Sequence, residues 1–100
     1  MSKFEPLNPL LHSQLRLALM SVLMRDKEGE FTFLRKETNA TAGNLSVQLN
    51  KLRQAGYIGV VKQFKQHYPQ TICNITPSGM EAFETYVRAL RAYLNPNGQW

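Results

Sequence analysis

Apolar residues recur at helical spacing in the first quarter of the chain. Asn8 followed by Pro9 is a typical helix start, since Asn is a good N-cap and proline is favoured at the first helical position. We therefore expect a helix over about residues 8–25. One stripe of this helix consists of Leu11, Leu15, Ala18 and Val22. Further leucines and methionines widen the stripe, so the helix must be covered on more than one side.

Two shorter amphipathic segments follow. Phe31 and Leu34 are three residues apart and predict the inner face of a helix over about 32–38. Thr41 is a good N-cap residue for a third helix over about 42–55. The inward positions of that third helix are Ala42, Leu45, Leu49 and Leu52.

The period then changes to that of β-strands. Residues 57–64 and 70–76 are rich in β-branched and aromatic residues, and a polar loop over 65–69 separates them. This pattern predicts a β-hairpin over about 57–76, with Cys73 and Ile75 on its inward face.

A last helix ends the pattern. Thr76 followed by Pro77 repeats the cap-then-proline signal and predicts a helix over about 77–94, with a flexible tail over 95–100. We expect a single domain over residues 1–100, mainly α with a small antiparallel β-hairpin, in the order helix, helix, helix, hairpin, helix.

Composition narrows the class of protein. The chain has 100 residues, 43% of them hydrophobic and 19% charged, which is typical of one folded domain and not of a disordered chain. Its single cysteine cannot form an intramolecular disulfide. The longest apolar run is far shorter than the roughly 18 residues of a membrane span, and no signal-peptide pattern precedes it. We expect a cytoplasmic protein without membrane association.

The charge of +5 is concentrated in one part of the chain. No Asp or Glu occurs between Thr38 and Met80. Four basic residues fall in that stretch: Lys51, Arg53, Lys62 and Lys65. A basic surface without carboxylates suits a polyanion such as DNA. A solvated face that happens to lack acids is the alternative.

The outer face of the third helix sharpens this interpretation. It carries small and amide side chains where an ordinary surface helix carries Glu–Lys pairs. Asn and Gln can pair with bases, and small residues allow a close approach to the major groove. The candidate DNA-contacting residues are Thr41, Ala42, Gly43, Asn44, Ser46, Val47, Asn50 and Lys51. An unremarkable polar face is the alternative.

The hairpin offers a second contact, with the DNA backbone or minor groove. The candidate residues there are Lys62, Lys65, Gln66, His67, Tyr68 and Gln70.

Several motifs resemble a known family. The runs Phe31–Arg35, Thr41–Ser46 and Leu49–Ile58 resemble winged-helix transcriptional regulators of the MarR and ArsR type, in particular a small single-domain group. Ile75–Gly79 is similar to that group's entry to the final helix, and Leu10–Arg16 to its opening. The resemblance implies a winged helix-turn-helix fold, with a three-helix core, a wing and a long C-terminal dimerisation helix. It also implies sequence-specific binding of double-stranded DNA by a homodimer.

The last helix supports dimerisation independently. It carries two apolar stripes, of which one can cover the core while the other needs a partner. The stripes are Met80, Phe83, Val87, Leu90 and Leu94, and Ala82, Tyr86, Ala89 and Tyr93. We expect a dimer interface formed by Leu11, Leu15, Leu19, Tyr86, Ala89, Leu90 and Tyr93. A single wide core face is the alternative.

No pattern predicts an enzyme. His12, His67 and Cys73 lack the spacing of metal ligands, and no phosphate loop or nucleophile motif occurs. We expect no metal and no cofactor. A small-molecule effector remains open, near Met20, Met24, Tyr86 and Tyr93. The rival function is a winged-helix module that binds protein and not specific DNA, because fold alone does not settle function.

Overall fold

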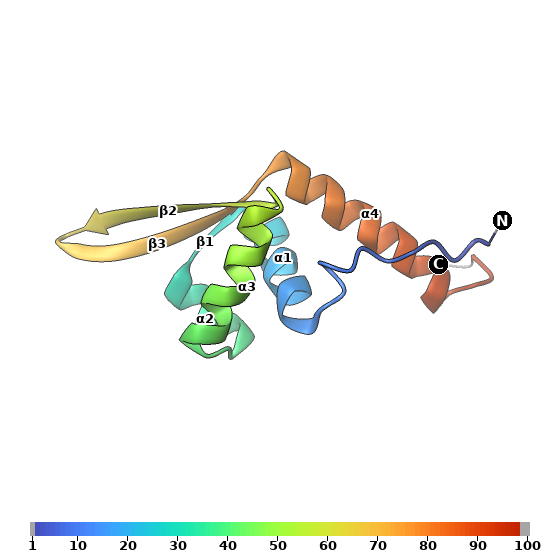
Figure 1. Cartoon of the computed structure of the whole chain (residues 1–100), viewed down its shortest axis with the longest axis horizontal. Helices are drawn as coiled ribbons and strands as arrows, with labels where there is room; N and C mark the ends of the chain where they lie inside the picture. Colours follow the sequence, from blue (N-terminus) through green and yellow to red (C-terminus); the bar gives the residue numbers. More distant parts are fainter. Residues whose placement is uncertain (1, 99–100) are drawn as a thin grey trace.

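A computed structural model describes residues 2–98 of the chain. The elements within these residues are α1 (Gln14–Asp26), β1 (Glu28–Glu30), α2 (Phe31–Thr38), α3 (Ala42–Gln54), β2 (Ile58–Lys65), β3 (Tyr68–Ile75) and α4 (Pro77–Leu94). The three strands form an antiparallel sheet in the order β1-β3-β2. Helices α1, α2 and α3 pack beside this sheet, and α4 projects away from it (Figure 1). This arrangement is a winged helix fold with a long C-terminal helix.

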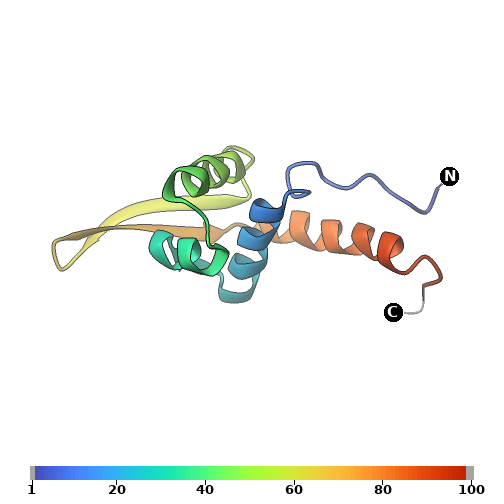
Figure 2. The ribbon, with the colours of Figure 1, turned by 90° about the horizontal axis from the view of Figure 1, so that it is seen from below.

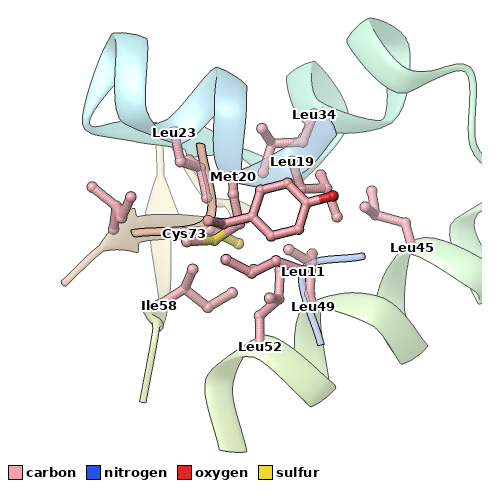
Figure 3. Close-up of a cluster of buried hydrophobic side chains, with 12 residues drawn as sticks. Leu11, Leu19, Met20, Leu23, Leu34, Leu45, Leu49, Leu52, Ile58 and Cys73 are labelled. Atoms are coloured by element: carbon pink, nitrogen blue, oxygen red, sulfur yellow. The ribbon is translucent and has the colours of Figure 1, made fainter. Parts of the chain in front are cut away.

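The core lies where α1, α2 and α3 meet the base of the sheet. Leucines of α3 point toward those of α1, with Cys73 of β3 between them (Figure 3). Their burial removes apolar surface from water, roughly 1.5–3 kcal/mol for each large side chain. The buried residues are Leu11, Leu19, Met20, Leu23, Leu34, Leu45, Leu49, Leu52, Ile58, Cys73, Ile75 and Tyr86.

Two threonine caps confirm the predicted starts of α3 and α4. The Thr41 hydroxyl accepts from the Asn44 backbone N–H at 3.2 Å, and the Thr76 hydroxyl accepts from the Gly79 N–H at 3.0 Å. A Cβ on Gly79 would lie 2.1 Å from the carbonyl oxygen of Tyr57. Only glycine therefore lets the first turn of α4 pack directly on the backbone that leads from α3 into the wing.

The first helix starts later than the sequence pattern predicts. Asn8 does cap a turn, in which its carbonyl accepts from the N–H groups of Leu11 and His12 at 3.1 and 2.9 Å, but that turn ends before α1 begins at Gln14. The expected start at residue 8 is therefore wrong by six residues, because the cap signal serves an isolated turn.

Strand β1 is not predicted by the sequence pattern. Its three residues adopt the strand conformation because they pair with Ile72–Asn74 of β3.

The connection in the hairpin is shorter than expected. Strands β2 and β3 pair up to Lys65 and Tyr68, so only Gln66 and His67 lie between them. Both have positive φ, 51° and 70°, as a two-residue hairpin turn of the primed type requires. Pro69, expected in the loop, pairs with Phe64 within the sheet. The strands therefore extend almost to the tip.

The molecule is elongated. Its extents are 55 × 25 × 21 Å and its radius of gyration is 15.1 Å, against about 13 Å for a compact chain of this length. The wing and α4 project in opposite directions, and the N-terminal segment follows α4 (Figure 2). Phe4 contacts Tyr93 there, with ring centroids 5.3 Å apart. No helix within residues 2–98 is long and apolar enough to cross a membrane.

Candidate nucleic-acid interface

Helix α3 presents one complete face to solvent. Leu45, Leu49 and Leu52 hold its other face in the core. This orientation brings together on the exposed face all eight residues that the sequence singled out: Thr41, Ala42, Gly43, Asn44, Ser46, Val47, Asn50 and Lys51. Ala42 had also been placed among the inward positions, and that placement is wrong, because it lies in the first turn, where the helix extends past the core.

The first turn of α3 is unusually slender. A Cβ on Gly43 would meet no atom within 4 Å, so the packing of the chain does not require glycine there. Glycine in a helix costs about 0.5–1 kcal/mol relative to alanine. The turn also carries no acidic side chain, and the N-terminal end of a helix has a partial positive charge. This end of α3 can therefore approach an anionic surface closely.

The wing extends the same surface. Five of the six residues predicted there are exposed, and Gln70 is half-buried. The aromatic side chains of Phe64 and Tyr68 are 78% and 74% exposed. Lys62 and Lys65 thus stand on an arm that reaches well beyond the body of the domain (Figure 1).

A groove of about 640 Å³ joins α3 to the wing. Ser46 and Asn50 of α3 line one side, and Lys62 of the wing lines the other. Arg53 also lines it, and its Nη2 donates to the Asn50 amide oxygen at 2.7 Å. Sequence reasoning counted the charge of Arg53 but did not assign it to this surface. Its spacing of three residues from Asn50 was the available signal.

The residues that line this groove include no Asp or Glu. Asp26 and Glu37 pair with Arg25, at 2.7 and 3.1 Å, and the hydrogen bond from Arg25 lowers the pKa of the Asp26 carboxyl. Glu28 and Glu30 lie in β1, at the opposite edge of β3 from β2. The face formed by α3, the groove and β2 is therefore basic and free of carboxylates.

The residues predicted for a dimer interface separate into two groups. Leu11, Leu19 and Tyr86 are only 0–3% exposed, so they belong to the core of this chain and are unavailable to a partner. That part of the prediction is wrong, because the turn before α1 packs against the first half of α4 within the same chain. The Tyr86 hydroxyl, for example, lies 2.9 Å from Nδ1 of His12. The other four are half-buried or exposed: Leu15, Ala89, Leu90 and Tyr93.

The four residues considered for an effector do not surround one cavity. Met20 is fully buried, and Tyr93 packs on Phe4. Tyr86 and Met24 line two different surface grooves. Burial raises the pKa of the Cys73 thiol to about 11, so it remains a neutral core group at physiological pH. No group of three His, Cys, Asp or Glu side chains able to hold a metal occurs in the described part of the chain.

Comparisons with known proteins agree with this geometry. A family model described as a winged helix DNA-binding domain matches residues 15–94. An uncharacterized protein of Methanocaldococcus jannaschii is 31% identical over 78 residues, which cover 78% of this chain and 85% of that protein. A transcriptional regulator homologue from Pyrococcus horikoshii OT3 has a similar structure, with a TM-score of 0.83 and 26% identity, covering 89% of this chain and 88% of that one.

More distant structures share the fold. A MarR-family transcriptional regulator from Silicibacter pomeroyi gives a TM-score of 0.65 at 16% identity, over 91% of this chain and 62% of its own. S. aureus MepR, solved in a complex with DNA, gives 0.69 at 13% identity, over 87% and 71%. These matches confirm the predicted resemblance. The chain belongs to the winged helix DNA-binding domain family and has the fold of the MarR-type transcriptional regulators.

Proposed function

We propose that this protein is a transcriptional regulator that binds a specific double-stranded DNA sequence as a homodimer. Helix α3 enters the major groove, and the wing lies on the backbone or in the adjacent minor groove. The observation that carries the proposal is the continuous basic face, free of carboxylates, that runs from α3 through the groove to the wing. MepR, which has this fold, was solved bound to DNA.

The two parts of this face have different roles. Asn44, Ser46 and Asn50 carry side chains that can hydrogen-bond base edges, and recognition helices use mainly their N-terminal residues for this purpose. Lys51, Lys62 and Lys65 supply positive charge for phosphates, which gives affinity but no sequence information. Base choice is thus assigned to α3, and most of the affinity to the lysines.

A second copy of the chain accounts for the exposed apolar surface of α4. The α4 stripe that contains Tyr86 and Tyr93 packs on the core and on the N-terminal segment. The second stripe, which runs from Met80 to Leu94, becomes more exposed toward the end of the helix, where Leu94 is 56% exposed. We place the twofold interface along Val87, Leu90 and Leu94. A twofold dimer of this kind sets two α3 helices about 10 base pairs apart, in successive major grooves of an approximate palindrome.

Selection from a random duplex library tests the proposal. The protein should enrich one palindromic sequence and bind it at least about 10³-fold more tightly than random DNA at physiological salt. Affinity for the enriched duplex should fall steeply as salt rises, because lysine–phosphate contacts release counterions. If no sequence is enriched and binding is weak at low salt, the proposal is wrong and a protein-binding winged helix becomes the better account.

A further inference from the structure

A chain of hydrogen bonds connects the start of α1 to the DNA-facing end of α3. Arg16 of α1 donates from Nε to the Leu10 carbonyl at 2.5 Å and from Nη1 to Oε1 of Gln48. Gln48 in turn donates from Nε2 to Oδ1 of Asn44 at 3.0 Å. Arg16 and Gln48 are half-buried, whereas Asn44 is exposed on the face assigned to base contacts.

The direction of this chain is fixed by the chemistry of its first member. A guanidinium has five donors and no acceptor, so the atom of Gln48 that faces Arg16 must be the amide oxygen. The NH₂ group of Gln48 is then the atom left for Asn44. A donor requires an acceptor opposite it, so Asn44 turns its oxygen inward and leaves both Nδ2 hydrogens for the solvent side.

The backbone at this position is also held. The Asn44 N–H donates to the Thr41 hydroxyl at 3.2 Å, which fixes the first turn of α3. Asn44 is thus oriented at its main chain by the cap and at its side chain by Gln48. A side chain that is already ordered loses less entropy when it binds.

We propose that Arg16 is a positioning residue that makes Asn44 a hydrogen-bond donor to DNA, an inference that rests on the function proposed above. Asn44 then selects a base with an acceptor in the major groove, such as N7 or O6 of guanine, and disfavours cytosine, which presents a donor there. Arg16 itself need not touch DNA. Its effect passes through Gln48.

Gln48→Glu provides the direct test. A glutamate keeps the bond from Arg16 but presents oxygen to Asn44, so Asn44 must turn its NH₂ inward and offer its oxygen to the base. The library selected by this variant should replace the acceptor base at one position of each half-site by cytosine, whose major-groove edge presents only a donor, with a change in preference of at least about fivefold. Gln54→Glu makes the same change of charge on the same helix, outside this chain of hydrogen bonds, and should weaken binding to all sequences alike.

Variants of Arg16 test the first link. Arg16→Lys keeps a donor-only group and should retain the wild-type base preference, whereas Arg16→Met should lose it at the same position. If Gln48→Glu and Arg16→Met both select the wild-type bases, the proposal is overturned. A uniform loss of affinity without a change of preferred base would also overturn it, because it would show a merely structural role.

A measurement on the free protein separates this inference from the proposed function. In ¹⁵N relaxation experiments, the side-chain amide of Gln48 should be nearly as ordered as the backbone in the wild type and mobile in Arg16→Met. A mobile Gln48 amide in the wild type overturns the inference alone, even if the protein selects a DNA sequence. An ordered amide in a protein that selects no sequence overturns the proposed function, and with it the reading role of Asn44.

Discussion

The wing and the distal half of α4 both project from the body of the domain, but they expose different chemistry. The wing carries Lys62 and Lys65 together with the well-exposed rings of Phe64 and Tyr68, and it has no acidic residue. The end of α4 exposes aliphatic and aromatic surface, with Leu94 at 56% and Tyr93 at 42%. The wing therefore suits a hydrated polyanion, and the end of α4 suits an apolar protein surface.

The contrast explains why so small a chain is elongated. The wing and α4 are joined at Thr76, which lies between the end of β3 and the start of α4. The Thr76 N–H donates to the Tyr57 carbonyl at 3.1 Å. The distance and angle between the wing and α4 are set at that junction.

Disrupting the α4 end should have the largest effect on DNA binding. Val87→Asp places a charge in the proposed twofold interface and should convert the dimer to monomers. Loss of the second half-site should then weaken binding to the selected duplex by about 10²–10⁴-fold. Sedimentation and fluorescence anisotropy measure the two effects. Thr85→Asp, an acid at an exposed position of the same helix, is the matched control and should remain dimeric.

The junction between the two ends comes next. Gly79→Ala forces a methyl group against the Tyr57 carbonyl and should lower the free energy of unfolding by about 1–3 kcal/mol. Gly43→Ala, in open space at the start of α3, should instead raise it by about 0.5–1 kcal/mol. Thermal and urea unfolding of both variants checks this difference. Equal stability of the two would show that the close approach at Gly79 carries no constraint.

Removing charge from the wing should have the smallest effect. Lys62→Gln and Lys65→Gln should each lower the slope of log affinity against log salt by about 1.8, because each substitution removes one phosphate contact from both subunits of the proposed dimer, and should leave the preferred sequence unchanged. Lys27→Gln, which removes the same charge just after α1, should leave the slope as it is. A change in preferred base on substitution of either wing lysine would mean that the wing reads sequence directly.

Much of the fold could be predicted from local signals. The caps at Thr41 and Thr76 and the spacing of the α3 leucines each act within a few residues, so the sequence displays them directly. Strand β1 could not be predicted, because Glu28–Glu30 is short and polar and becomes a strand only by pairing with β3. The start of α1 was misplaced because Asn8 and Pro9 serve the turn before it.

The site was predictable in composition but not in its connections. Exposure of the α3 face followed from its period, and all eight residues chosen there are exposed. The bonds from Arg16 to Gln48 and from Arg53 to Asn50 depend on how the helices pack and on which rotamers result. Similarly, both stripes of α4 look alike in sequence, and only packing shows that Tyr86 belongs to the core.

Titration of the ¹⁵N-labelled protein with the enriched duplex tests the central claim most directly. We predict that the largest changes in amide chemical shift fall on the exposed face of α3, within residues 41–51, and on the wing, within residues 62–70, while residues 87–94 of α4 remain nearly unchanged. Changes confined to α4 and the N-terminal segment, or no change on α3 at saturating DNA, would contradict the account.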